Sequence, residues 1–127
     1  MSFAFSGYSS AALDLSHFDT SKVTNMVQMF SGSDLESLDL SGFDVSKVKD
    51  ATRMFDECIF LKTIYCADSG TEWVFDPEGG TDDMFYACKE LKGVYGETVV
   101  AYAEGNVGAE YARSAKLGGY FTPKNEE

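Results

Sequence analysis

The sequence states nearly the same eighteen residues twice, as LDLSHFDTSKVTNMVQMF at 13–30 and LDLSGFDVSKVKDATRMF at 38–55, with eleven identities. The period is 25 residues, and marker phenylalanines extend it in both directions. They are Phe5, Phe30, Phe55 and Phe85, spaced 25, 25 and 30 residues apart. A direct repeat of this length predicts an array of similar units, each of which buries an apolar face against its neighbours.

Each unit begins with an alternating segment. In Leu38-Asp39-Leu40-Ser41, apolar and polar residues alternate with period two, which predicts a short strand with the leucines inward. Behind it, apolar residues recur at helical spacing, preceded by polar residues that can cap a helix. The stripe in the second unit consists of Phe43, Val48, Ala51, Met54 and Phe55.

These patterns predict an α/β repeat solenoid with leucine-rich-repeat-like coils of about 25 residues. Each coil is expected to hold one short parallel strand and one short helix, and a C-terminal cap closes the array. The expected strands are 13–16, 38–41, 64–67 and 93–96.

The third unit departs from the pattern. Trp73 lies twelve residues before Phe85, as Phe43 lies twelve before Phe55, which places Trp73 in the same core position. The extra residues predict a loop at 67–72, and a proline with two glycines predicts irregular backbone over 76–81. The aromatic residues of the two recurring positions are expected to be largely buried: Phe18, Phe30, Phe43, Phe55, Trp73 and Phe85.

The repeat ends near Val94. Residues 1–94 are therefore predicted to form the array, with a partial first unit, two regular units and one irregular unit. Residues 95–127 are predicted to form a C-terminal cap of the same domain, with a short helix at 108–116. Met1 falls partway through a unit, so we expect a fragment of a longer protein or a severely shortened one.

The composition excludes several classes of partner. Ten Lys and Arg against twenty-one Asp and Glu give a net charge of -11, which repels nucleic acid and anionic membranes. The chain has no apolar run long enough to span a bilayer and no signal-peptide pattern at its start. Direct membrane insertion is therefore not expected.

The three cysteines lack the spacing of a metal or redox motif. Cys58 and Cys88 each follow a marker phenylalanine by three residues, and Cys66 takes an inward strand position. We predict free buried thiols, because an unpaired cysteine packs as a small apolar residue. Equivalent positions in stacked units lie close enough that a bond between Cys58 and Cys88 is also geometrically allowed.

The two repeated blocks, together with GYFT at 119–122, resemble the BspA-like repeat of bacterial surface proteins, a branch of the leucine-rich-repeat group. The chain departs from that pattern at Asp50, at Ala51 and through its third unit. The resemblance implies a secreted or wall-attached protein of a host-associated bacterium, with repeats that serve adhesion or ligand capture. It brings no catalytic residues with it.

No catalytic constellation can be assembled from the sequence. His17 is the only histidine, and glycine replaces it in the next unit. We therefore predict a non-catalytic binding or adhesion module, without a cofactor, whose partner is a protein or glycan on a host or neighbouring cell. The alternative is a structural spacer or stalk segment with no ligand of its own.

The predicted binding surface is the outward face of the strands. Its outward positions carry acidic residues at one end and aromatic residues at the other, and the inserted loop borders them. The candidate binding residues are Asp14, Asp39, Tyr65, Tyr95, Ala67, Asp68 and Glu72. Calcium is a minor alternative, because stacked carboxylates repel unless a cation relieves them. The aspartates also repeat with the rest of the unit, which fits the spacer.

Overall fold

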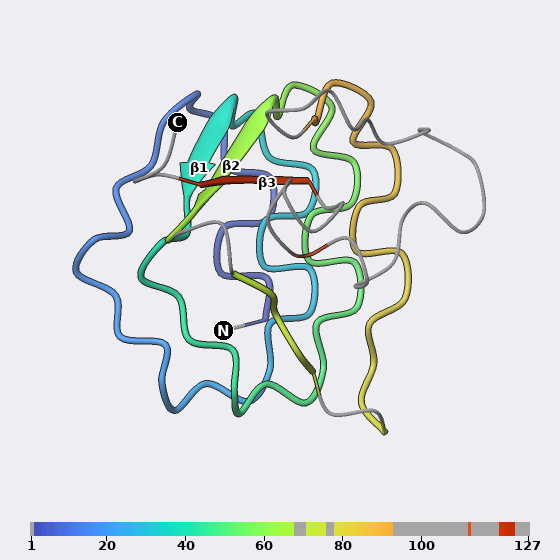
Figure 1. Cartoon of the computed structure of the whole chain (residues 1–127). Helices are drawn as coiled ribbons and strands as arrows, with labels where there is room; N and C mark the ends of the chain where they lie inside the picture. The colour runs from blue at the N-terminus through green and yellow to red at the C-terminus, as the bar shows by residue number, and fades with distance from the viewer. Residues whose placement is uncertain (1, 68–70, 76–77, 93–111, 113–119, 124–127) are drawn as a thin grey trace.

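The computed structural model describes residues 2–67, 71–75, 78–92, 112 and 120–123. Three short strands form one parallel sheet in the order β1-β2-β3 (Figure 1). They are β1 (Ser37–Asp39), β2 (Thr63–Cys66) and β3 (Phe121–Pro123). The parallel strands predicted at 38–41 and 64–67 are confirmed, each beginning one residue earlier than expected.

Residues 13–16 form no strand, contrary to prediction. Leu15 is buried and Asp14 is exposed, as the alternation requires. Just before this segment, at Ala11, the chain still pairs with the following repeat, because the backbone N–H of Glu36 donates to the carbonyl of Ala11 at 3.1 Å. The ladder does not continue into 13–16, where the chain turns instead.

The sheet position beyond β2 is occupied by β3, which comes from the C-terminal segment. Ile64 lies opposite Phe121, and Tyr65 lies opposite Thr122. The strand predicted at 93–96 lies outside the described residues. A segment predicted only as part of the cap therefore forms the third strand of the sheet.

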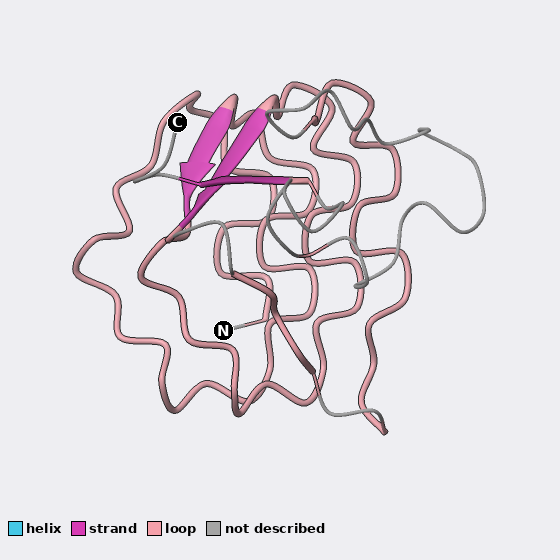
Figure 2. Cartoon of the chain, viewed as in Figure 1, coloured by secondary structure: helices cyan, strands magenta, loops and turns pink. Residues whose placement is uncertain are grey.

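The predicted helix of each unit is wrong for the described residues, which fold into consecutive turns (Figure 2). The backbone is left-handed at Gln28 and Arg53, with φ angles of 51° and 56°. It is left-handed again four residues later, at Gly32 and Glu57, with φ angles of 66° and 57°. A right-handed helix cannot pass through such residues.

The N–H groups of these turn segments bond to the next unit. Phe5 donates to the carbonyl of Met29 at 2.8 Å, and Phe30 donates to Met54 at 2.9 Å. The same ladder joins the second unit to the third: Ala51 to Gly80, Arg53 to Asp82, Phe55 to Met84 and Glu57 to Tyr86. Figure 1 shows these segments side by side in sequence order.

The ladder is already present at Gly80, within the stretch of the third unit predicted to be irregular. Asp50 pairs in parallel with both Asn25 and Gly80, and the N–H of Gly80 donates to the carbonyl of Lys49. The irregular backbone predicted for 76–81 therefore does not extend through Gly80. Residues 76–77 lie outside the described part of the chain.

The core contains a column of marker phenylalanines. The rings of Phe5, Phe30, Phe55 and Phe85 stack nearly parallel, with successive centroids 5.7, 5.6 and 5.4 Å apart. Offset stacking at such distances is a favoured aromatic arrangement. Because one ring comes from each unit, the column joins the units through their interior.

A second column confirms the position predicted for Trp73. Its ring stacks on Phe43 at 6.3 Å, and only 8% of the residue is exposed. Phe43 is half-buried, whereas Phe18 is 39% exposed and contradicts the prediction. Phe18 contacts Phe5 at 5.7 Å, but no described unit covers its outer side.

Residues of the predicted cap contact the third unit. The ring of Tyr120 meets Phe85 edge-on at 5.3 Å, and Phe121 meets Trp73 edge-on at 4.9 Å. Buried Ala112 accepts a hydrogen bond from the N–H of Trp73. The helix predicted at 108–116 otherwise lies outside the described residues, and among those described no helix is long and apolar enough to cross a membrane.

Candidate functional site

The outward face of the sheet brings two of the predicted residues together. Asp39 on β1 lies directly opposite Tyr65 on β2, and Thr122 of β3 lies on the other side of Tyr65. Tyr95 lies outside the described residues. Thr122 was missed, although the aromatic and β-branched run Tyr120-Phe121-Thr122 is itself typical of a strand.

A small hollow of about 240 Å³ opens beside this row of residues. Its lining residues are Ala12, Leu13, Ser37, Asp39 and Tyr65. Asp14 is exposed and does not line it. Two of the four outward positions that we predicted as one surface therefore share a hollow.

Asp14 and Asp39 each have a local structural role. The carboxylate of Asp14 accepts the N–H of Ser16 at 2.9 Å, and that of Asp39 accepts the N–H of Ser41 at 3.0 Å. Such bonds stabilise a turn two residues ahead. The pKa of Asp14 is lowered mainly by a hydrogen bond from the hydroxyl of Ser16 and also by the one from its N–H.

The recurrence of aspartate thus follows from a repeated turn. Within the described ranges, no three His, Cys, Asp or Glu side chains gather as a set of metal ligands.

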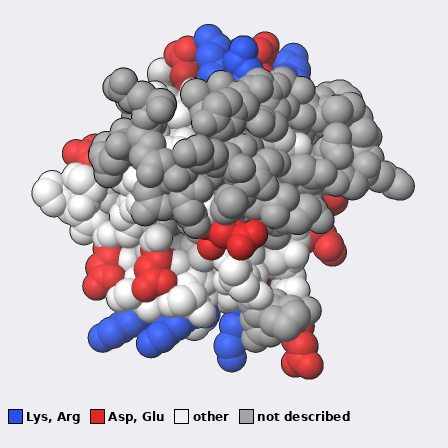
Figure 3. Space-filling view, viewed as in Figure 1, with Lys and Arg blue, Asp and Glu red and all other residues white. Residues whose placement is uncertain are grey.

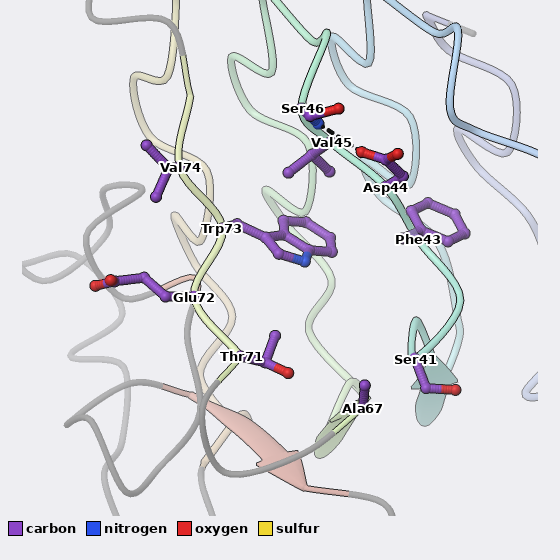
Figure 4. A pocket seen from close by; sticks show the side chains of 10 residues that line it. All are labelled: Ser41, Phe43, Asp44, Val45, Ser46, Ala67, Thr71, Glu72, Trp73 and Val74. Atoms are coloured by element: carbon purple, nitrogen blue, oxygen red, sulfur yellow. Dashed lines mark hydrogen bonds between the residues drawn. The ribbon is translucent and has the colours of Figure 1, made fainter.

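A larger groove of about 530 Å³ lies between the second unit and the third (Figure 4). Its lining residues are Ser41, Phe43, Asp44, Val45, Ser46, Ala67, Thr71, Glu72, Trp73 and Val74. The loop residues Ala67 and Glu72, predicted to border the binding face, belong to this groove. Asp68 lies outside the described residues.

The floor of the groove is apolar. The ring of Trp73 projects toward Phe43 and Val45, and the side chain of Glu72 points away from that ring (Figure 4). Val74 is 71% exposed, and its side chain, like that of Glu72, points away from the ring of Trp73 (Figure 4). The periodicity of Phe43 and Trp73 predicts their burial, but it does not indicate that the two rings share an open edge.

One carboxylate is fixed at the edge of this floor. Asp44 accepts the N–H of Ser46 at 2.9 Å, and its own N–H donates to the hydroxyl of Thr20 at 2.8 Å. The pKa of Asp44 is lowered mainly by a hydrogen bond from the hydroxyl of Ser46 and also by the one from its N–H. Asp44 therefore remains negatively charged at neutral pH and holds a fixed orientation.

Charge is unevenly distributed over the molecule. On the face drawn in Figure 3, acidic side chains occur over its whole height, whereas Lys and Arg gather at the upper and lower ends. Two of the cations are engaged in ion pairs between units, Arg53 with Asp83 at 3.9 Å and Lys62 with Glu36 at 3.8 Å. The net negative charge favours a partner that carries positive charge.

A further carboxyl group is buried away from both hollows. Asp56 is 5% exposed, and its Oδ1 has no hydrogen-bond partner in the described structure. Burial raises the pKa of Asp56, and a hydrogen bond from Ser31 opposes that shift. In the preceding unit the same position holds Ser31 itself.

Comparison with curated proteins and with solved structures returns no match. A family model described as "Mycoplasma protein of unknown function, DUF285" matches residues 1–98, which include all the repeated units. This match covers 98 of the 127 residues. Because the match covers more than half of the chain, the chain belongs to the DUF285 family.

Proposed function

We propose that this chain is a non-catalytic binding or adhesion module of a bacterial cell-surface protein. In this proposal the units form a leucine-rich-repeat-like solenoid of the BspA-like kind, secreted or attached to the cell surface. The groove between the second unit and the third carries the proposal, because it combines an aromatic floor with a fixed carboxylate. Rigid scaffolds that display such sites are well suited to binding.

The chemistry of the groove favours a protein segment with an apolar side chain next to a lysine or arginine. The apolar side chain would pack on Phe43 and Trp73, and the cation would bond to Asp44. The net charge of -11 would attract such a segment before contact and would disfavour acidic competitors. A glycan of the host or a neighbouring cell is the second ligand class, since sugar rings also pack on aromatic side chains.

The first test is a binding screen of the full chain against immobilised host matrix proteins and a glycan array. The tightest ligand is then measured with Asp44→Asn, which removes the charge but keeps an oxygen that accepts the N–H of Ser46. We expect affinity to fall about tenfold, because a charge-assisted hydrogen bond contributes roughly 1.5 kcal/mol or more. Higher salt should weaken the wild-type complex and narrow this difference.

Asp19→Asn is the matched control. Asp19 makes the same turn with Ser21 at 2.9 Å, but it does not line the groove. It should therefore leave the affinity unchanged. Equal losses in the two variants, or none in Asp44→Asn, would contradict a site in the groove.

Tyr65→Ser distinguishes the groove from the outward face of the sheet. Tyr65 lines the smaller hollow beside Asp39 and has no part in the larger groove. If the ligand binds the groove, this variant should bind as the wild type does. A loss with Tyr65→Ser and none with Asp44→Asn would move the site to the sheet.

The structural spacer is the second candidate, and one observation favours it. Asp14 and Asp39 recur because each stabilises a turn, so their repetition needs no ligand to explain it. A folded chain that binds nothing in the screen, at concentrations well above those typical of adhesion, would favour the spacer over the binding module.

A further inference from the structure

The interior of the stack contains one polar column that runs from unit to unit. Ser33, Cys58 and Cys88 each lie three residues after a marker phenylalanine, and all three are essentially fully buried. The equivalent side chain is therefore a hydroxyl in one unit and a thiol in the next two. Their spacings of 25 and 30 residues match those of the phenylalanines.

Side chains in this column contact their neighbours directly. Ser33 Oγ lies 3.6 Å from Cys58 Sγ. The thiol of Cys58 donates to the carbonyl of Phe30 at 3.1 Å, and the thiol of Cys88 donates to that of Phe55 at 2.8 Å. Each thiol thus reaches back toward the preceding unit in the same way.

Cys88 lies next to Cys58 in this column, because its thiol reaches the carbonyl of Phe55, three residues before Cys58. Burial raises the pKa of Cys88, so its thiol stays protonated in the folded chain. The N–H of Glu57, next to Cys58, donates to the carbonyl of Tyr86 at 2.7 Å. Backbones paired in this way lie about 5 Å apart, within the Cα separation that a disulfide spans.

We propose that Cys58 and Cys88 form a disulfide when the chain folds in an oxidising compartment, and that this bond joins the second unit to the third. The supply of an oxidant rests on the proposed location at the cell surface. The oxidant is a small-molecule disulfide such as oxidised glutathione. The reaction occurs while this part of the stack is open, because both thiols are buried in the closed structure.

The exchange is balanced in two steps. A thiolate of one cysteine attacks a sulfur of oxidised glutathione, which forms a mixed disulfide and releases one glutathione thiolate. The second cysteine, once deprotonated, attacks the protein sulfur of the mixed disulfide and releases the second glutathione. One disulfide bond breaks, one forms, and the two departing glutathiones take up the two protons.

The location of the bond gives it a structural purpose. The segment between the two cysteines contains the inserted loop and the glycine-rich stretch of the third unit. Closing this segment into a loop restricts the unfolded chain, which raises stability. The bond would therefore reinforce the array where the repeat is least regular.

The test compares the full chain refolded with reduced and oxidised glutathione and the same chain refolded with reductant alone. Intact mass spectrometry should show the loss of two hydrogen atoms, and peptide mapping should join Cys58 to Cys88. The melting temperature should rise by roughly 10 °C or more relative to the reduced chain. Three free thiols after oxidative refolding, or a bond that includes Cys66, would overturn the proposal.

Two variants make the result specific. Cys58→Ser copies the residue that Ser33 already places in this column, so it should fold but should gain neither the cross-link nor the added stability. Cys66→Ser is the control, because Cys66 lies on β2 opposite Pro123, away from the column. It should still form the cross-link; its failure to do so while folded would contradict the assignment. Neither readout depends on ligand binding, so the result stands apart from the groove experiments.

Discussion

The second and third units each contain a turn segment of the same kind, but the connections between strand and turn segment differ. In the second unit, Phe43 follows β1 within a short, regular connection. In the third, Trp73 reaches the equivalent position only after an inserted loop. The N–H groups of the turn segment in the second unit nevertheless donate to carbonyls of the turn segment in the third. Each unit also places a marker phenylalanine in the same column. The third unit therefore accommodates its insertion before the turn segment, which is kept intact.

The largest expected effect comes from breaking the shared column. Phe55 is fully buried between Phe30 and Phe85, so Phe55→Ala should lower the free energy of unfolding by about 3 to 5 kcal/mol. Phe18→Ala is the comparison, because Phe18 is partly exposed at the end of the second column. It should cost about 1 kcal/mol. Urea denaturation measures both, and equal losses would contradict the stacking order.

The next effect tests the point where the irregular unit rejoins the ladder. A Cβ at Gly80 would lie 2.5 Å from Asp50 Oδ1 and 2.6 Å from Thr52 Oγ1. Gly80→Ala should therefore destabilise the chain by about 1 to 3 kcal/mol, because these atoms must move. Gly42→Ala has open space around its Cβ and should change stability little. A thermal melt in which both variants match the wild type would show that the two units do not approach this closely.

The smallest effect concerns Asp56, which takes the position of Ser31. Asp56→Ser should raise stability at neutral pH by about 1 kcal/mol, because it removes a buried carboxylate whose Oδ1 lacks a partner. The free energy of unfolding at several pH values, from urea titrations, measures this difference. A variant less stable than the wild type at neutral pH would show that the carboxylate is stabilising there.

The pH dependence of Asp56 has a defined sign. Its pKa is raised in the folded state, so the folded chain binds the proton more tightly than the unfolded chain does. This contribution to stability is fully present below the unfolded pKa, near 3.8, and is lost as the pH rises through the higher folded pKa. Asp56→Ser should remove that dependence, so its advantage over the wild type should shrink on acidification.

The sequence was sufficient to predict two features that depend on neighbouring repeats. The parallel pairing of 38–41 with 64–67 and the position of Trp73 both follow from the period. Phe18 was mispredicted because periodicity identifies a core position without indicating which unit lies at an end. β3 was missed because no repeat relates it to β2.

The helices were mispredicted for a different reason. Apolar residues spaced three and four apart line a helix, but they also line a chain of tight turns that faces its neighbours. The left-handed residues that decide between the two, Gln28 and Arg53, are neither glycine nor asparagine, so composition gives no signal. The groove was predicted in part: Ala67 and Glu72 were included, whereas Phe43 and Trp73 were assigned to the core alone.

The pairing of units through their turn segments can be measured directly by NMR, as scalar couplings across hydrogen bonds in isotopically labelled protein. The structure predicts a coupling between the amide nitrogen of Phe30 and the carbonyl carbon of Met54, which belongs to the next unit. A helical segment would instead couple Phe30 to Met26, four residues earlier. Detection of the coupling to Met54 would establish the stack, and detection of the coupling to Met26 would contradict it.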